Sequence, residues 1–323
     1  MTGVPRHTIE ALSLVRPGRH VVTIGNFDGV HLGHQHLLSL VMAHAAQVGA
    51  SSLVITFEPH PIAVLRPEQA PPRIATPDEK VRRLTDAGIE QVVAIPFDLD
   101  FASLLPEEFL SIIVDAACPT DVFVGEGFRF GKMRAGDVAT LTRFGHEHDF
   151  ICHTVPPLSD DHGVISSSRV RSALLSGEVD VATRLLGRRY RLVGSVEHGM
   201  ARGRDLGYPT ANLDVPSDLC VPRDGIYAGY ARFDDSDSRP HEALIYIGTS
   251  PTFGDRDRLV EVNILDYRGD LYGHQLEIEF VAFVRGDQVF DTTEALMAQM
   301  KEDESTSRQV LSETAPESHL RGN

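Results

Sequence analysis

The sequence predicts two unlike domains: an α/β domain with a doubly wound parallel sheet, followed by an all-β domain that ends in one helix. Strand and helix patterns alternate through the first half of the chain. Beyond it, short segments of alternating hydrophobicity are separated by Gly, Pro and Asp turns, which is typical of an antiparallel barrel or sandwich. A chain of 323 residues is long enough for two cores of ordinary size. We expect the domains to comprise residues 1–186 and 187–323.

Five apolar runs are the expected strands of the parallel sheet, at 21–24, 53–57, 92–95, 122–125 and, more weakly, 151–155. Helical periodicity follows the first run at 37–48 and the second at 81–87. Pro77 and Pro106 are each followed by acidic residues, so we expect each to begin a helix. Because ligands of such sheets bind at the carboxyl ends of the strands, functional residues are expected just after them.

Six β-rich segments fill the second half: GRRYRLVGSVEHG, LGYPTANL, GIYAGYARF, HEALIYIGT, LVEVNILDY and QLEIEFVAFV. A helical pattern then runs from Thr292 to about residue 311. Leu296, Met300 and Val310 are the residues of this helix that we expect to face inward. The tail SETAPESHLRGN has little to bury and is expected to be loose.

The composition is that of an ordinary globular protein, with 42% hydrophobic and 24% charged residues. A formal net charge of −16 argues against general nucleic-acid binding, which requires a basic surface. No apolar run reaches the roughly 18 residues of a membrane span, and the first residues lack the apolar core of a signal peptide. Three scattered cysteines suit a reducing cytosol, so we expect a cytoplasmic protein. The oligomeric state is left open.

The stretch GNFDGVHLGH, residues 25–34, lies between the first expected strand and the first long helix. Gly25 and Gly29 permit a tight turn and a close backbone approach to a ligand. His31 and His34 lie at the helix start, where free N–H groups and the helix dipole attract phosphate. Two histidines there could bind phosphate, bind a metal or cap the helix, but no third zinc ligand occurs at a recognisable spacing. We expect them to donate hydrogen bonds to phosphoryl oxygens.

This stretch resembles the HxGH motif of the nucleotidylyltransferases. More narrowly, the chain is similar to the bacterial bifunctional riboflavin kinase/FMN adenylyltransferase (FAD synthetase) family, whose further motifs follow in order. They are TFEPHP, VGEGFRFG and ISSSRVR in the first half, and GRDLGYPTANL, DGIYAG, IGTSPTFG and VEVNILD in the second. HxGH alone is shared by a superfamily, whereas HxGH followed by PTAN in one chain is highly specific. The resemblance covers nearly the whole chain and implies a Rossmann-like nucleotidylyltransferase domain followed by a six-stranded antiparallel barrel with a closing helix.

The resemblance also implies two reactions. A C-terminal kinase would convert riboflavin and ATP to FMN and ADP, and an N-terminal adenylyltransferase would convert FMN and ATP to FAD and pyrophosphate. ATP is then the co-substrate and Mg²⁺ serves both sites. The expected partners are riboflavin, FMN, FAD and ATP, with no nucleic acid and no membrane. Two alternatives stay open: a riboflavin kinase with a silent first domain, and a flavin-binding module without turnover.

In the first domain, the resemblance implies a direct attack of the FMN phosphate on ATP, without a protein nucleophile. The residues expected to stabilise the phosphates are His31, His34, Ser167 and Arg171. The further residues expected to contact ATP are Gly25, Phe27, Asp28, Gly29, Ser166 and Ser168. His60 and Pro61 follow a strand end and are expected to contact the flavin. Phe128 and Phe130 could flank the flavin ring or belong to the core, and both interpretations stay open.

In the second domain, the resemblance implies that Thr210 and Asn212 hold Mg²⁺ and ATP phosphates, since their side-chain oxygens suit a hard cation. Gly203 belongs to a glycine-rich loop expected beside the ATP. Glu261 would be the base that accepts a proton from the terminal ribityl hydroxyl. An inward carboxylate would be unusual in the alternating strand LVEVNIL, and an outward, solvated glutamate is the alternative. Arg285 resembles a flavin-site residue, with a plain surface charge as the alternative.

The chain departs from the family pattern at four positions. Gly127 stands in VGEGFRFG where the family usually has Asp or Asn, so one polar contact of the adenylyltransferase site is expected to be missing. Ser168 replaces the usual threonine and keeps its hydroxyl. Ser250 stands where asparagine is common, and Asp287 where glutamate is common. Only Gly127 therefore puts an activity in doubt.

Overall fold

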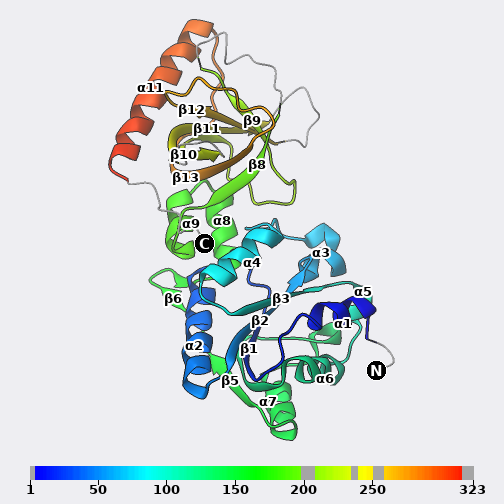
Figure 1. The fold of residues 1–323 in the computed structure, drawn as a ribbon. Coiled ribbons are helices and arrows are strands. Elements are labelled where there is room, and N and C mark those ends of the chain that lie inside the picture. The colour runs from blue at the N-terminus through cyan, green and yellow to red at the C-terminus, as the bar shows by residue number, and fades with distance from the viewer. Residues whose placement is uncertain (1–3, 198–207, 234–238, 250–257, 315–323) are drawn as a thin grey trace. The chain divides into compact units, whose positions relative to one another are not determined.

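The computed structural model describes residues 4–197, 208–233, 239–249 and 258–314 (Figure 1). The chain divides into two compact units, residues 1–167 and 168–323. The first contains a parallel sheet and the second a closed barrel. The predicted α/β-plus-all-β architecture is therefore confirmed.

The sheet of the first unit has five strands in the order β3-β2-β1-β4-β5, and all neighbouring pairs are parallel. Its strands are β1 (His20–Ile24), β2 (Ser51–Glu58), β3 (Gln91–Pro96), β4 (Pro119–Gly125) and β5 (Ile151–Val155). All five predicted runs thus form strands. The chain proceeds outward from β1 to β3 and then returns to place β4 on the other side of β1. This reversal puts the expected ligand crevice at the carboxyl ends of β1 and β4.

Helices connect these strands. The α-helices are α1 (Arg6–Leu12), α2 (Leu32–Val48), α3 (Pro61–Leu65), α4 (Pro77–Asp86), α5 (Leu99–Ala102), α6 (Pro106–Ala117) and α7 (Val138–Glu147). The shorter elements are the 3-10 turns η1 (Pro67–Gln69) and η2 (Lys132–Arg134) and the strands β6 (Ser159–Asp160) and β7 (Gly163–Val164), which pair with each other. Pro77 and Pro106 each occupy the first turn of a helix, as predicted. There the ring's fixed φ favours the helix and its missing N–H costs no hydrogen bond.

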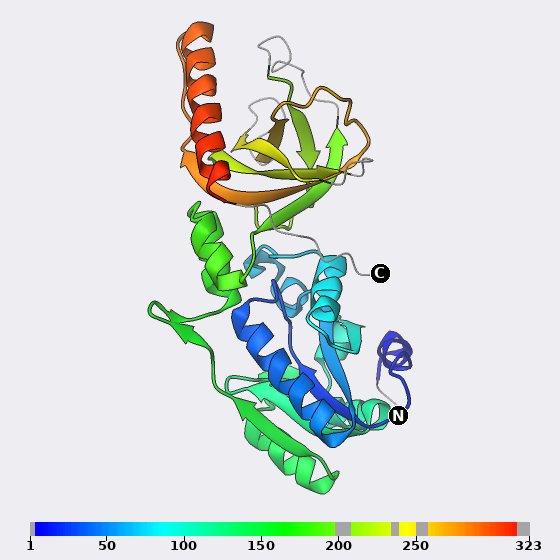
Figure 2. The same cartoon turned by 60° about the vertical axis from the view of Figure 1, so that its left-hand side comes forward.

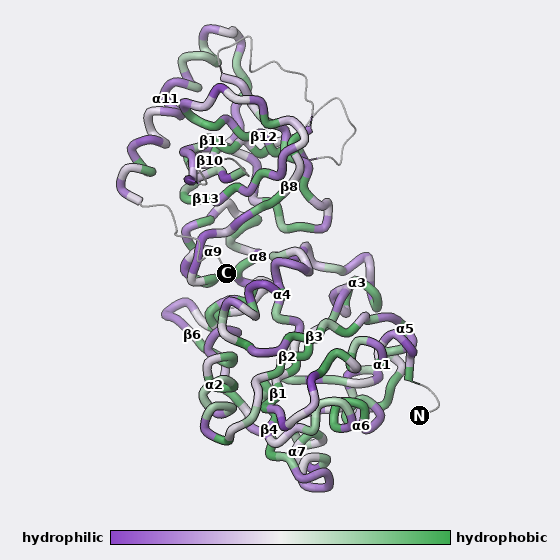
Figure 3. The backbone as a smooth tube through the Cα atoms, viewed as in Figure 1, coloured by the Kyte–Doolittle hydropathy of each residue, from purple (hydrophilic) through white to green (hydrophobic). Residues whose placement is uncertain are grey.

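Each face of the sheet has its own hydrophobic core. Val21 packs in a cluster with Leu38 and Val41 of α2, whereas its neighbour Val22 packs in a second cluster with Leu110 and Ile113 of α6. Successive side chains of a strand point to opposite faces, so a strand covered on both sides is apolar at every position. Figure 2 shows α2 lying along the sheet, and Figure 3 shows hydrophobic residues concentrated along the central strands.

The second unit is built around a closed barrel in the order β10-β11-β12-β9-β8-β13. Its strands are β8 (Arg191–Glu197), β9 (Ala211–Asp214), β10 (Gly225–Phe233), β11 (His241–Thr249), β12 (Arg258–Ile264) and β13 (Gln275–Arg285). Every neighbouring pair is antiparallel. Each of the six predicted β-rich segments contributes one strand, and the barrel is confirmed over the sandwich.

Among the described residues, three helices accompany the barrel: α8 (Ser167–Leu175), which begins at the boundary of the units, α9 (Val179–Leu186) and α11 (Thr293–Ser312). The backbone N–H of Arg223 donates to the carbonyl of Leu174, 3.1 Å away, and so ties the end of α8 to the loop before β10. Leu185 and Leu186 of α9 are each only 1% exposed. Segments on the N-terminal side of residue 187 therefore pack with the barrel.

The inward face of α11 differs from the prediction. The helix is where the pattern placed it, with Thr292 as its N-cap. Leu296, Met300 and Val310 are only half-buried, whereas the most buried positions are Asp303, Ser307 and Leu311. The spacing of apolar residues could not predict this face, because two of its most buried residues, Asp303 and Ser307, are polar. The tail after residue 314 lies outside the described residues.

Candidate active sites

The turn between β1 and α2 is held by close contacts of Gly29, Asp28 and Gly25 with neighbouring segments. Gly29 has a φ of +78°, and a Cβ there would lie 2.7 Å from Cγ2 of Ile74. The carboxylate of Asp28 accepts a hydrogen bond from the backbone N–H of Ile74, with 3.0 Å between Oδ1 and N. Gly25 donates its N–H to the carbonyl of Ile55 on β2. Phe27 is only 1% exposed and its ring packs in the hydrophobic core.

His31 and His34 meet at the first turn of α2. His31 is the N-cap, and its Nδ1 accepts a hydrogen bond from the backbone N–H of His34 over 3.3 Å. A neutral His31 therefore carries its proton on Nε2. The two rings stack, with centroids 3.7 Å apart and planes inclined by 19°. Between them lies Gly33, where a Cβ would come within 3.1 Å of the His31 ring and of the Ile165 carbonyl, which explains the glycine of HxGH.

The electrostatic surroundings of His34 keep its ring neutral. Burial lowers the pKa of His34 well below its usual value, and the charges of His31 and Lys80 lower it further. Its Nδ1 is enclosed and has no hydrogen bond to any residue in the described part of the chain. At neutral pH, His34 can therefore act as a hydrogen-bonding group but not as a cation.

Lys80 is a member of this site that the sequence analysis did not identify. It lies on α4 and is 5% exposed. Its Nζ donates to the carbonyl of Phe57 over 3.0 Å and lies 2.5 Å from Oε1 of Glu58, at the carboxyl end of β2. A lysine in an amphipathic helix is ordinarily solvated, so the sequence carried no signal for its burial.

The ISSSR segment lies against the turn after β1. The hydroxyl of Ser167 donates to the carbonyl oxygen of Asp28 over 2.9 Å. Ser166 precedes α8 and is half-buried, whereas Ser168 is exposed. Arg171 follows Ser167 by one turn of α8, so both lie on the same side of this helix. The structure thus brings Ser167 to the HxGH turn.

The TFEPHP motif lies beside the same turn. His60 is the N-cap of α3, where its Nδ1 accepts from the N–H of Ile62, and Pro61 occupies the first position of that helix. The other ring nitrogen of His60 is 3.4 Å from Nδ2 of Asn26. The hydroxyl of Thr56 donates to the carbonyl of Asn26 over 3.1 Å. Two strand ends, β1 and β2, therefore present their motifs together.

The two phenylalanines after β4 differ in their burial. Phe130 is 7% exposed and belongs to the hydrophobic core. Phe128 is half-buried and stacks on Phe130, with ring centroids 5.3 Å apart. Gly127 is exposed, has no left-handed φ, and a Cβ added to it meets no atom within 4 Å. Nothing in the backbone here requires a glycine.

In the barrel, Glu261 of β12 lies directly opposite Asn212 of β9 and Tyr246 of β11. Directly opposed residues of antiparallel strands point to the same face, so these three side chains are neighbours. Val260 and Val262, each 1% exposed, point to the other face, into the barrel. Glu261 is half-buried on the face opposite the barrel core, so it is neither enclosed among the apolar residues nor fully solvated.

This face of the barrel gathers negative charge and oxygen ligands. Burial raises the pKa of Tyr246 to about 12, with the carboxylates of Asp287, Glu261 and Asp224 adding to the effect. Thr210 precedes Asn212 by two residues and lines a hollow together with Ala211 and Val262, whose side chains alternate with those of Asn212 and Glu261. Gly203 lies outside the described residues.

Arg285 is held by a carboxylate at the end of β13. Its Nε and Nη2 donate to the two oxygens of Asp303, over 2.8 and 2.7 Å, in a bidentate pair. Its guanidinium also lies over the ring of Phe290, 5.7 Å from the centroid. The guanidinium of Arg285 is thus fixed by a bidentate pair, unlike the solvated surface charge that the sequence left as the alternative.

Together these features define a two-part protein: a nucleotidyltransferase-like α/β unit with an HxGH turn at its switch point, followed by a six-stranded barrel. The FAD synthetase family model matches residues 15–169, and the riboflavin kinase family model matches residues 186–311. No helix among the described residues is both long enough and apolar enough to cross a membrane.

Relatives match over most of the chain. The bifunctional riboflavin kinase/FMN adenylyltransferase of Escherichia coli K12 is 34% identical, over 92% of this chain and 94% of its own. The enzyme of the same name from Pseudomonas fluorescens is 35% identical, over 96% and 99%, and that from Bacillus subtilis is 32% identical, over 93% of each. The chain therefore belongs to the family of bifunctional riboflavin kinase/FMN adenylyltransferases.

A solved structure shares the whole fold. It is described as a macrolide-efflux protein from Streptococcus pneumoniae, and it aligns with a TM-score of 0.84 and 31% sequence identity. The alignment covers 94% of this chain and 98% of that one. The succession of parallel sheet and closed barrel is thus the same in both proteins.

Proposed function

We propose that the chain makes FMN from riboflavin and then FAD from FMN, consuming one ATP in each step. The observation that supports this proposal is that the chain has two compact units, each matched by one of the two family models and each carrying side chains that we assign to phosphate. His31, His34 and Ser167 lie at the HxGH turn, and Glu261 with Asn212 lies on the barrel. A module that only bound flavin would need neither set.

Adenylyl transfer is assigned to residues 1–186. A phosphate oxygen of FMN attacks the α-phosphorus of ATP, and pyrophosphate leaves, so no protein nucleophile is needed. Negative charge builds up on phosphoryl oxygens in this step, and hydrogen-bond donors aimed at them lower the barrier. The backbone N–H groups of Leu32 and Gly33 at the start of α2, the Nε2–H of His31 and the neutral ring of His34 are assigned as such donors. Arg171 adds a rigid cation.

The flavin of FMN is assigned to the neighbouring strand ends. His60 and Pro61 follow β2, and Phe128 follows β4. The half-buried ring of Phe128 offers an apolar surface for an isoalloxazine, while Phe130 supports that ring from the core. ATP contacts are assigned to the backbone from Gly25 to Gly29 and to the serines of ISSSR.

Riboflavin phosphorylation is assigned to residues 187–323. Glu261 accepts the proton of the terminal ribityl hydroxyl, whose oxygen attacks the γ-phosphorus of ATP as ADP leaves. Arg285, fixed by Asp303, is assigned to the flavin. Glu261 carries the base role because it lies beside Asn212, one of the two residues assigned to the phosphates.

Mg²⁺ is assigned to Thr210 and Asn212. Asn212 offers an amide oxygen and Thr210 a hydroxyl, two residues apart, with the carboxylate of Glu261 directly across from Asn212. Hard oxygen donors of this kind are the ligands that Mg²⁺ takes in proteins. Thr210 and Asn212 would hold the ion, which supplies charge neutralisation for the transferring phosphate.

The cellular setting of the proposal is the cytoplasm, where ATP is available, with no nucleic-acid or membrane partner. The net charge of −16 supports the absence of a nucleic-acid partner.

One incubation of the full chain with riboflavin, ATP and Mg²⁺ tests the proposal. FMN should appear first and FAD later, with one pyrophosphate released for each FAD. Accumulation of FMN alone, also when FMN is supplied, would favour a kinase with a silent first unit. Flavin binding without either product would favour the binding module.

A further inference from the structure

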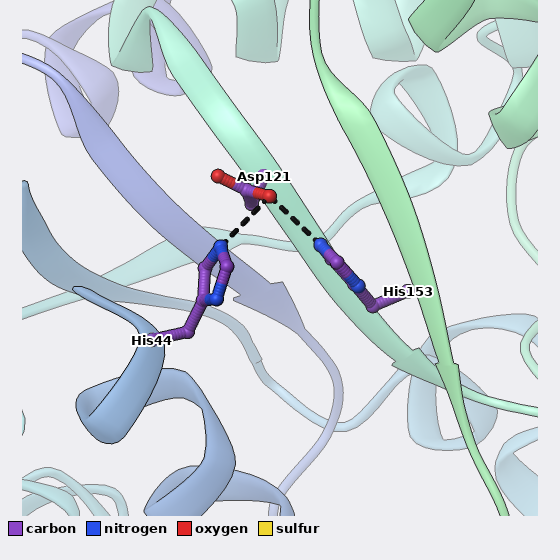
Figure 4. A group of neighbouring side chains, drawn as sticks. All are labelled: His44, Asp121 and His153. Carbon is purple, nitrogen blue, oxygen red and sulfur yellow. Dashed lines mark hydrogen bonds and ion pairs between the residues drawn. The ribbon is translucent and has the colours of Figure 1, made fainter. Parts of the chain in front are cut away.

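Two histidines and one aspartate from three separate elements meet in the first unit (Figure 4). Asp121 lies on β4, His153 on the adjacent β5, and His44 on α2, which covers this face of the sheet. Oδ1 of Asp121 is 2.9 Å from Nε2 of His44 and 2.7 Å from Nε2 of His153. One carboxylate oxygen therefore faces two imidazole nitrogens.

This cluster is separate from the adenylyltransferase site. Asp121 and His153 are each the third residue of their strand, whereas the HxGH turn follows the carboxyl end of β1. His34 and His44 lie on the same helix, and a rise of about 1.5 Å for each residue separates them by about 15 Å. The reactions proposed above use none of the three residues.

The cluster is held in place by its neighbours. The ring of His153 stacks on Phe123, its cross-strand partner, with centroids 4.3 Å apart. Asp121 is 5% exposed, so its carboxylate is buried between the two imidazoles.

Both imidazoles approach the same carboxylate oxygen, but their contacts differ in direction. His153 makes a hydrogen bond to Asp121. Nε2 of His44, although close to the same oxygen, is a buried atom without a well-directed hydrogen bond to any residue that the structure describes. The 2.9 Å contact between His44 and Asp121 thus brings two potential ligand atoms together without a well-directed hydrogen bond between them.

The spacing of the three donors matches a small cation. In a tetrahedral zinc site with bonds of about 2.0–2.1 Å, the ligand atoms lie about 3.3–3.4 Å apart. The three donor atoms here all lie within 4.8 Å of one another, and the two nitrogen–oxygen contacts would have to open by only about 0.5 Å. A hollow lined by His44, Asp121, Cys118 and Thr120 leaves room for a further ligand.

We propose that His44, Asp121 and His153 form a binding site for a divalent transition-metal ion, best matched by Zn²⁺, apart from both ATP sites. Two imidazoles and one carboxylate are a ligand set that suits Zn²⁺ and not Mg²⁺, which prefers oxygen ligands throughout. The geometry leaves the fourth position to water.

Equilibrium dialysis of the EDTA-treated full chain against Zn²⁺ tests the site directly. The wild type should bind one Zn²⁺ ion that His153→Gln and His44→Gln both lose. Removal of a residue that only orients a ligand weakens metal binding about 10–100-fold, so removal of a ligand should weaken it at least as much. Co²⁺ should give the wild type a strong visible absorption that both variants lack.

Two further variants make the result specific. His36→Gln changes an exposed histidine of the same helix and should bind Zn²⁺ like the wild type. His34→Ala removes one histidine of the His31–His34 pair and should also retain this ion. The proposal would be overturned if His153→Gln bound Zn²⁺ as well as the wild type does. It would also be overturned if His34→Ala alone lost the bound Zn²⁺ ion. Should His44→Gln fail to fold, a Zn²⁺-dependent rise in melting temperature that His153→Gln lacks would provide the second readout.

Discussion

The hydroxyl of Ser167 donates a 2.9 Å hydrogen bond to the carbonyl oxygen of Asp28, across 139 positions of sequence. Asp28 in turn accepts the backbone N–H of Ile74. The start of α8, the turn after β1 and the segment before α4 are thereby joined at one strand end. Phosphoryl chemistry depends mainly on positioning and charge stabilisation, so this connection bears directly on adenylyl transfer.

Ser167→Ala should slow FAD formation while FMN formation continues. Loss of one hydrogen bond costs about 0.5–1.5 kcal/mol, which corresponds to roughly a two- to tenfold loss of rate if it is felt in the transition state. The measurement is the rate of FAD formation from supplied FMN. Ser172→Ala, which changes an exposed serine of the same helix, is the matched control. Equal rates in the two variants would show that the Ser167 hydroxyl does not position the site.

Gly127→Asn should fold normally, because the added side chain meets open space and the backbone has no left-handed φ. It should leave FAD formation intact or tighten FMN binding by at most about 0.5–1.5 kcal/mol, the value of one net hydrogen bond. Titration of FMN binding measures this. Gly131→Asn is the contrasting control, since a Cβ there would lie 2.8 Å from the backbone nitrogen of Pro106. Loss of folding in Gly127→Asn would contradict the description of this segment.

The depressed pKa of His34 should make the protein less stable in mild acid. Below about pH 6.5 the unfolded chain takes up a proton at this residue that the folded chain does not, so stability falls as pH drops from there toward the folded-state pKa. His34→Gln should therefore lose less stability than the wild type between about pH 7.5 and about pH 5.5. Urea unfolding followed by circular dichroism measures the difference. His36→Gln should behave as the wild type does, and an unchanged pH dependence in His34→Gln would contradict the assignment.

Fragments that contain only the second unit should phosphorylate riboflavin, but their free energy of unfolding should depend on the residue at which the fragment begins. A fragment of residues 187–323 lacks α8 and α9, whereas one of residues 168–323 retains nearly all of both. Leu185 and Leu186 are almost fully buried, and each such side chain contributes about 1.5–3 kcal/mol. Urea unfolding should thus show the longer fragment to be more stable. A shorter fragment that folds yet lacks the kinase activity of the full chain would contradict its assignment to residues 187–323.

Local patterns predicted the elements of the fold because each has its own signal. Buried parallel strands such as β2 are apolar runs, and the prolines of α4 and α6 mark the residues where these helices begin. The weakest predicted strand, β5, is an edge strand whose Ile151 is 61% exposed, so its apolar run is less continuous.

Contacts between distant segments carried no such signal. The sequence placed His31 and His34 at a helix start, but Lys80 reaches their surroundings from another helix. Asp303 resembles a solvated helix residue until Arg285 is found beside it. His44, Asp121 and His153 are separated in sequence by entire elements and meet only once the strand order is known.

The most direct measurement of the central claim, one chemistry for each unit, is the identity of the products made by His34→Ala and Glu261→Gln. His34→Ala should form FMN from riboflavin but lose about 10²–10³ in the rate of FAD formation, as when a transition-state hydrogen-bond donor is removed. Glu261→Gln keeps the shape of the side chain and removes the base, so it should make no FMN, yet convert supplied FMN to FAD normally. His36→Ala and Glu294→Gln, at exposed positions, should retain both steps. If either folded variant loses both steps equally, or neither step, the division of chemistry between the units is contradicted.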